Sequence, residues 1–441
     1  MMKKQISIYF ILFAILALLG GVLFGIIGAF QFIIPGFFKS IPFIQCRPLH
    51  VSLVIAWIFL SAVGGIYYYL SRYCNVTLYS TKLPRIHLWI FILTGFMILG
   101  AYLAGKFGGK EYWEFPPVLA IPIIISWILF GFNYFKTVFT KTDPWPVYIW
   151  MWGTGIFFFL FTYMESNLWV FPYFRDNLVR DITVQWKANG SLVGSWNMLI
   201  YGTAIFLMDR IKNDDTISKS RLAFIMYFLG LINLIFNWAH HIYIVPNALW
   251  IRYIAYGISM TELIILGKII WNWKKNLSKA LQDFHILSIR FIVASDVWIL
   301  LNLVLAIALS IPAINIFTHG THLTVAHAMG STIGINTMIL IASCLFLIPD
   351  IAQKQFSALQ GRLISIGFWI INIILLFFWL ALIFAGYIKG YLIIQDKLIY
   401  QDIMLQIRPY MATVAITGVA IFAGMLMIFT PALKMIKDYL R

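Results

Sequence analysis

The chain has 441 residues, of which 62% are hydrophobic and only 11% charged, and its mean hydropathy is +0.89. These values exclude an ordinary soluble domain, and the apolar segments leave no room for a sizeable soluble one. The formal net charge of +16 does not indicate nucleic-acid binding, because lysine and arginine are concentrated between apolar segments, as in membrane proteins.

Apolar runs of about 20 residues recur along the chain and predict transmembrane helices. The twelve expected spans are 7–30, 48–71, 86–105, 117–135, 145–165, 188–209, 222–244, 248–272, 286–310, 314–348, 361–388 and 406–433. We therefore expect an all-α integral membrane protein with one twelve-helix domain over residues 1–441. The first run follows MMKK but is too long for a signal peptide, so it is expected to be an uncleaved span. The over-long run 314–348 is expected to tilt or to begin at the membrane surface.

The distribution of lysine and arginine predicts the orientation. They are more frequent at the two termini and in the even-numbered loops than in the odd-numbered loops, so both termini are expected on the cytoplasmic side. This topology places six of the eight histidines in the outer half of the membrane. These are His50, His240, His241, His319, His322 and His327.

Histidine is rare in hydrocarbon, and neutral imidazole is the commonest metal ligand. Three of the six histidines fall in FTHGTHLTVAHAMGSTIGI (317–335), and two are adjacent in NWAHHIYIVP. The sixth, His50, is the fourth residue of the apolar segment RPLHVSLVIAWIFL. This concentration at one depth predicts metal centres between helices. His87 and His285 lie near cytoplasmic span ends, and no role is predicted for them. The three cysteines form neither CxxC nor CxxCH, so no covalently attached haem is predicted.

The motifs WAHHIY, HGTHLTVAHAMG and RPLH resemble the catalytic subunit of the haem-copper oxidase superfamily. The run from His240 and His241 through Pro246 and Trp250 to Ser259 and Glu262 is similar to the nitric oxide reductase branch, as is GKEYWEFPP at 109–117. The oxidase motif H-P-E-V-Y is absent from the sixth span.

This resemblance implies three cofactors. His327 would be the proximal ligand of a high-spin haem b, and His50 would ligate a low-spin haem b. His240 and His241 would bind a non-haem metal, iron or alternatively copper. The resemblance also implies that Arg47 and His319 lie near haem propionates, and that Glu114 binds calcium between propionates.

The sequence departs from the reductase pattern at several positions. Met329 replaces the second histidine of the low-spin haem, which predicts His50/Met329 ligation and a raised haem potential. In NGSLVGSWN (189–197), Asn189 replaces a third metal-binding histidine. An amide oxygen ligand suits iron better than copper. Val193 and Asn197 replace two glutamates, which leaves Glu262 as the candidate for proton delivery or tuning.

The activity implied is reduction of two nitric oxide molecules to nitrous oxide and water in a prokaryotic inner membrane. Electrons would come from a cytochrome c, a cupredoxin-like protein or quinol. The chain has no long N-terminal extension like that of quinol-dependent reductases, so a separate donor subunit is expected. Three alternatives stay open: a nitric oxide dismutase, a terminal oxidase that reduces oxygen, and a twelve-span secondary transporter, although no inverted repeat is visible.

Overall fold

The structure is a computed structural model that describes residues 5–74, 76–243, 245–246, 248–396 and 399–441. Within these ranges every named element is a helix, and the only β-type contact is an isolated bridge between Lys110 and Trp113. The predicted all-α class is confirmed. The MMKK segment and Ile244, at the end of a predicted span, lie outside the described residues.

Twelve helical segments in the described part of the chain are long and apolar enough to cross a membrane, which confirms the predicted number. Their main helices are α1 (Ile6–Ile33), α2 (Phe43–Tyr73), α3 (Leu83–Leu103), α4 (Ala120–Val138), α5 (Val147–Glu165), α7 (Leu178–Lys212), α8 (Arg221–Phe236), α9 (Leu249–Ile258), α10 (Thr261–Lys275), α12 (Ile286–Ser310), α14 (His322–Met329), α15 (Met338–Ala352), α16 (Ala358–Tyr391) and α17 (Tyr400–Leu440). The shorter elements are η1 (Pro117–Leu119), η2 (Leu168–Val170), α6 (Pro172–Arg175), the 3-10 helix η3 (Asn237–Ile242), α11 (Lys279–Phe284), α13 (Pro312–Thr318), and the π-helices η4 (Gly330–Thr337) and η5 (Leu392–Asp396). Helices suit the bilayer because they satisfy backbone hydrogen bonds without water.

The sixth span, α7, is longer than predicted. It contains 35 residues, or about 52 Å at 1.5 Å per residue, so it extends beyond a hydrocarbon core of about 30 Å. Its start is capped by Asn177, whose side chain accepts a hydrogen bond from the backbone N–H of Arg180. The prediction began too late, at 188, because the first turns carry charged residues.

Two predicted spans are present as Leu249–Lys275 and His322–Ala352, but the helix of each predicted range is interrupted. The range 248–272 breaks between α9 and α10, where Met260 has a left-handed φ of 57°. The range 314–348 contains α13, a turn at Gly320 (φ 77°), and then α14, η4 and α15. Glycine adopts this backbone conformation without a steric cost, which explains why the second break occurs there.

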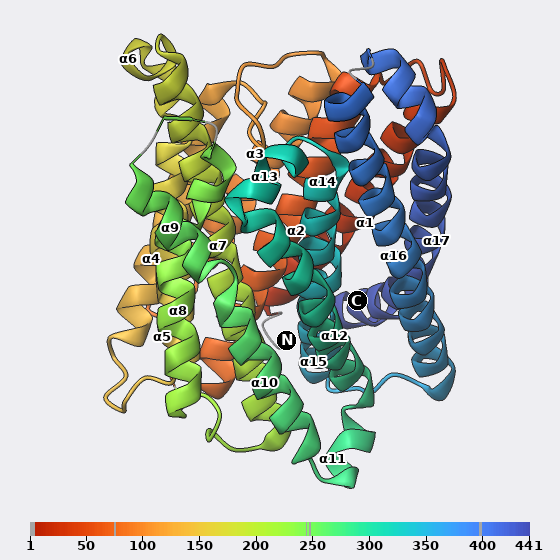
Figure 1. Ribbon diagram of the computed structural model, residues 1–441. Coiled ribbons are helices and arrows are strands. Elements are labelled where there is room, and N and C mark those ends of the chain that lie inside the picture. Colours follow the sequence, from red (N-terminus) through yellow and green to blue (C-terminus); the bar gives the residue numbers. More distant parts are fainter. Residues whose placement is uncertain (1–4, 75, 244, 247, 397–398) are drawn as a thin grey trace. The chain divides into compact units, whose positions relative to one another are not determined.

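The chain divides into two compact units. Unit 1 contains the residues up to Ala14 and Ile58–Ile286, and unit 2 contains Ile15–Trp57 and Leu287–Arg441. In unit 1, α5 packs along α7. In unit 2, α16 and α17 run side by side (Figure 1). They approach closely at Gly367, where a Cβ would lie 2.6 Å from the carbonyl oxygen of Gly424.

Candidate functional site

The adjacent histidines of unit 1 lie on η3, which continues α8. The ring centroids of His240 and His241 are 4.1 Å apart. Nδ1 of His240 lies 3.0 Å from Oδ1 of Asn237. Because an amide oxygen only accepts hydrogen bonds, Nδ1 carries the proton in this pair and the lone pair is on Nε2. Metal-binding histidines are commonly oriented in this way, because the ring nitrogen that does not bind the metal donates its proton to an oxygen.

Helix α7 is fixed against this pair by two contacts. The ring of Trp186 stacks on that of His241, with centroids 5.1 Å apart and planes 13° apart. One turn later, a Cβ on Gly190 would lie 2.6 Å from Cβ and 2.8 Å from Cα of Trp238. The absence of a side chain at Gly190 therefore permits α7 and η3 to approach closely.

Asn189 lies between these two contacts and is only 2% exposed. Its Nδ2 donates to the carbonyl oxygen of Glu111 at 3.4 Å, whereas its Oδ1 is buried without a hydrogen-bond partner. A buried acceptor without a donor is costly, and a cation would satisfy it. The described residues contain no cluster of three His, Cys, Asp or Glu side chains that could bind a metal. Two imidazoles and one amide oxygen would be the donor set of the predicted non-haem metal, and this ligand set stays a prediction.

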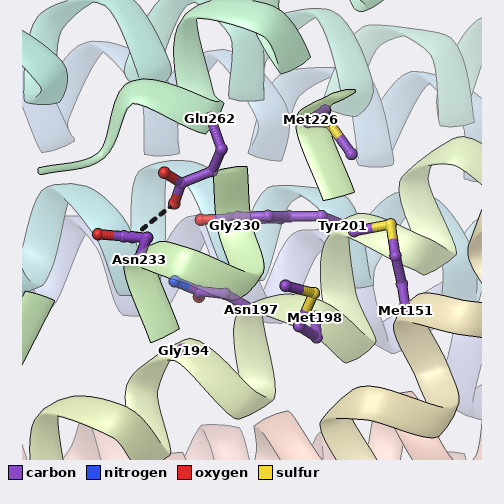
Figure 2. A pocket seen from close by; sticks show the side chains of 9 residues that line it. All are labelled: Met151, Gly194, Asn197, Met198, Tyr201, Met226, Gly230, Asn233 and Glu262. Atoms are coloured by element: carbon purple, nitrogen blue, oxygen red, sulfur yellow. Dashed lines mark hydrogen bonds between the residues drawn. The ribbon is translucent and has the colours of Figure 1, made fainter. Parts of the chain in front are cut away.

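Glu262 lies in the first turn of α10 and is 3% exposed. Its Oε1 accepts a hydrogen bond of 2.8 Å from Nδ2 of Asn233 on α8, and its Oε2 is buried without a partner. Figure 2 shows these two side chains pointing toward one another in a pocket that Asn197, Met198 and Tyr201 of α7 also line.

The pocket has about 280 Å³ of empty space, including its opening. None of its lining residues is basic, so an ionised Glu262 would lack a positive partner in a low-dielectric setting. Asn197, which replaces a glutamate of the reductase pattern, lines this same pocket. Glu262 is therefore the acidic group that the pocket offers for holding a proton.

The loop after α3 covers the start of α7. The carbonyl oxygen of Glu114 accepts hydrogen bonds from the N–H groups of Gly108 and Gly109, at 3.1 and 3.3 Å. Lys110 Nζ pairs with Asp181 of α7 at 2.5 Å. With the bond between Asn189 and Glu111, these contacts connect the loop to the candidate metal ligand. Calcium binding by Glu114 stays a prediction.

In unit 2, His50 lies on α2 and faces α1. Its Nδ1 lies 2.7 Å from the carbonyl oxygen of Gly21. A carbonyl only accepts, so the proton is on Nδ1 and the lone pair on Nε2. A Cβ on Gly25 would lie 2.7 Å from Nδ1, so glycine is needed where the ring packs. The orientation fits an axial haem ligand. Arg47 is exposed, one helical turn before His50.

His327 and Met329 end α14, directly before the π-helix η4. Nδ1 of His327 is buried without a partner. Positions two residues apart on an α-helix point about 200° apart, because each residue turns the helix by about 100°. The two side chains therefore leave opposite sides of one helix, as ligands of two different haems would.

The other two histidines of the motif flank the break before α14. His319 ends α13, and its backbone N–H donates to the carbonyl oxygen of Asn315 at 2.8 Å. His322 begins α14, and its Nδ1 is buried without a partner. Lys389 of α16 donates to the carbonyl oxygen of Gly320 at 3.1 Å and anchors the turn between them. The propionate contact of His319 stays a prediction.

His87, for which no role was predicted, differs from the candidate ligands. It is 1% exposed, its ring packs against those of Phe10 and Phe130, and its Nδ1 lies 3.5 Å from the hydroxyl of Tyr67. His285 follows α11, and its backbone N–H donates to the carbonyl oxygen of Leu281. Both environments fit structural residues.

Comparison with known proteins identifies the family. Residues 5–428 match the family described as Cytochrome C and Quinol oxidase polypeptide I. The chain belongs to this family. Its members are oxidoreductases that bind haems and a non-haem metal, so the chain is a multi-pass membrane oxidoreductase. The secondary-transporter alternative is set aside.

Individual relatives include both reductases and oxidases. A nitric oxide reductase subunit of Stutzerimonas stutzeri is 24% identical over 415 residues, which is 87% of this chain and 84% of that protein. Cbb3-type cytochrome c oxidase subunit CcoN1 of the same organism is 24% identical, covering 75% and 71%. Cytochrome c oxidase subunit 1 of Rhodobacter capsulatus is 25% identical, covering 84% and 72%.

Among solved structures, a heme-copper terminal oxidase dimer matches with a TM-score of 0.77 at 15% identity, covering 98% of this chain and 83% of that one. The predicted haem-copper oxidase subunit I-like fold is therefore confirmed.

Sequence reasoning missed several residues that orient the candidate ligands. Asn233 bonds Glu262, Gly21 bonds His50, and Trp186 stacks on His241. Asn233 could have been noticed, because placing an amide within the apolar run LINLIFN costs free energy, and such residues are candidates for a function. A backbone acceptor such as that of Gly21 leaves no signal in the sequence.

Proposed function

We propose that this chain is the catalytic subunit of a nitric oxide reductase in a prokaryotic inner membrane, with both termini on the cytoplasmic side. Its non-haem metal ligands would be His240, His241 and Asn189. A high-spin haem b would be bound by His327, and a low-spin haem b by His50 and Met329.

The observation that carries this proposal is the buried Asn189 carboxamide on the part of α7 that packs against η3. Its buried Oδ1 lacks a hydrogen-bond donor, and stacking of Trp186 on His241 holds this part of α7 at η3. A non-haem site with one oxygen donor favours iron over copper. The similarity to a nitric oxide reductase subunit over 87% of the chain supports the same assignment.

When bound, the haems would supply electrons and the non-haem metal a Lewis acid. Two nitric oxide molecules, two electrons and two protons give nitrous oxide and water. The chain's contribution is to hold the metal through two imidazoles and an amide and to present a proton at Oε2 of Glu262. Asn233 keeps the carboxyl group in place through Oε1. Calcium at Glu114 completes the proposal.

The test is mass spectrometry of the gas above purified, reduced protein supplied with nitrogen-15-labelled nitric oxide without oxygen. Labelled nitrous oxide with consumption of electrons supports the reductase. Labelled dinitrogen and oxygen without net electron consumption would establish a dismutase instead. The double variant His240→Ala/His241→Ala is expected to retain b-type haem bands and to form no labelled nitrous oxide.

Oxygen reduction is the second candidate, because several relatives are cytochrome c oxidases at 24–25% identity. An oxygen electrode, with the same reduced protein, decides between them: rapid oxygen uptake with negligible nitrous oxide formation would refute the reductase. The electron donor is proposed to be a cytochrome c, a cupredoxin-like protein or quinol. Each candidate donor is supplied in turn, and the one that supports turnover of the purified protein is the electron donor.

A further inference from the structure

The π-helix η4 follows Met329 directly and lies in unit 2 between α12 and α16. On α12, Asn302 donates from Nδ2 to the hydroxyl of Ser331 at 2.8 Å. A Cβ on Gly334 would lie 2.5 Å from Cγ of Trp298. The indole of Trp298 in turn donates to Oδ1 of Asn372 on α16 at 3.0 Å. The π-helix is therefore contacted by side chains of α12, and α16 fixes one of them in turn.

Two buried polar atoms in this region have no partner. Oδ1 of Asn302, a residue that is 0% exposed, can only accept, and Nε1 of Trp379, a residue that is 7% exposed, can only donate. Both lie close to the position that a Cβ of Gly330 would take, which is 3.1 Å from Nε1 of Trp379. The distances from this Cβ position to Oδ1 of Asn302 and to Nε1 of Trp379 add up to less than two hydrogen-bond lengths of about 2.9 Å each. The two atoms are therefore close enough for one water molecule to bridge them.

We propose that one internal water molecule lies beside Gly330, accepts a hydrogen bond from Trp379 and donates one to Asn302, and that these two residues position Met329 as a haem ligand. The second part rests on the proposed function. A buried water usually makes about three hydrogen bonds to polar groups that otherwise lack partners. This water satisfies the two orphaned atoms at once.

The positioning effect follows from the helix geometry. A π-helix carries an extra residue per turn relative to an α-helix, so it sets the rotation of the preceding α14 relative to the well-buried α15. Gly330 is the first π-helical residue and follows Met329. The water and its two partners fix Gly330, and so the direction in which the thioether of Met329 leaves the helix.

The experiment compares Trp379→Phe with Trp369→Phe. Both residues are on α16, but Trp369 is 58% exposed. The first change removes the buried N–H and keeps an aromatic ring. We expect it to lower the ratio of methionine-bound to methionine-free ferric haem about tenfold, equivalent to about 1.4 kcal/mol. The measurement is the weak near-infrared band of methionine-ligated ferric haem, and the control is expected to leave it unchanged.

A high-resolution structure of the wild-type protein supplies a readout independent of haem. Density for a water within hydrogen-bond distance of both atoms supports the inference, and a direct bond between Trp379 and Asn302 without water overturns it. Equal bands in the two variants overturn the positioning role. If the wild-type protein binds haem but lacks the methionine band, the assignment of Met329 as a haem ligand in the proposed function is refuted. The density for the water then decides by itself whether the bridge between Trp379 and Asn302 exists.

Discussion

Substitution of Gly190 by alanine is expected to release the non-haem metal while leaving the haems bound. The added Cβ would lie 2.6 Å from Cβ of Trp238, whereas packed carbon atoms are about 3.5–4.0 Å apart. Helix α7 and η3 would have to separate by about 1 Å. Metal sites tolerate deviations of about 0.2 Å in ligand distance, so Asn189 and the histidine pair could no longer bind one ion together.

The expected cost in stability is small enough for the variant to fold. Overpacking costs about 1–3 kcal/mol, and replacing glycine by alanine within a helix returns about 0.5–1 kcal/mol. We therefore expect a net loss of about 0–2.5 kcal/mol and at least a tenfold fall in bound metal per protein. Elemental mass spectrometry measures the metal, and the absorption of extracted haem measures the haem.

Gly95→Ala is the matched control. Gly95 also lies within a helix of unit 1, but a Cβ there would meet nothing within 4 Å. This variant is expected to keep its metal and to be slightly more stable. Equal metal content in the two variants would refute the reasoning that contact between α7 and η3 assembles the site.

Three further outcomes are expected. Asn189→Ala should lower the bound metal without loss of haem, and Asn189→His should restore it, as elemental analysis will show; unchanged metal in Asn189→Ala would remove the amide from the ligand set. Met329→His should lower the potential of the low-spin haem in a redox titration, since a thioether raises it; an unchanged potential contradicts ligation by Met329. Burial raises the pKa of the Cys74 thiol to about 11. In a Cys46→Ser/Cys344→Ser protein, the alkylation rate of Cys74 should therefore rise tenfold per pH unit from pH 8 to about pH 10. A plateau of the rate above about pH 8.5, the ordinary pKa of a thiol, would contradict the raised pKa.

The number of spans could be predicted from sequence because each depends on a local property, the length of an apolar run. The interruptions could not. The break at Met260 left only a weak signal, the S-x-x-E pattern of Ser259 and Glu262, which is typical of a helix start but was interpreted as part of the reductase motif. Conversely, Pro48 and Pro349 lie inside helices, because neighbouring helices in a membrane protein can satisfy the backbone groups that proline frees.

The candidate ligands were visible in sequence, but what orients them was not. The histidines stand out because polar side chains are rare in apolar runs, whereas Asn189 emerged only from the comparison of NGSLVGSWN with the reductase pattern. The π-helix after Met329 depends on Trp298 and Asn302, which belong to another helix, and on the close packing that Gly334 permits. Such long-range packing determines backbone form without leaving a local pattern, so a single sequence does not reveal it.

At two of the candidate ligands, the hydrogen-bond partner of Nδ1 indicates which ring nitrogen is free to bind a metal. Nδ1 of His240 and Nδ1 of His50 each face an oxygen that can only accept, the amide of Asn237 and the carbonyl of Gly21. Each therefore has its proton on Nδ1 and its lone pair on Nε2 before any cofactor binds. His87 faces the hydroxyl of Tyr67 at 3.5 Å, and a hydroxyl can donate as well as accept. Its proton is thus not assigned to one nitrogen. Because a metal binds the nitrogen that carries the lone pair, the acceptor opposite Nδ1 supports ligation at His240 and His50. His327, whose Nδ1 is buried without a partner, is proposed as a ligand from the family resemblance and not from its hydrogen bonding.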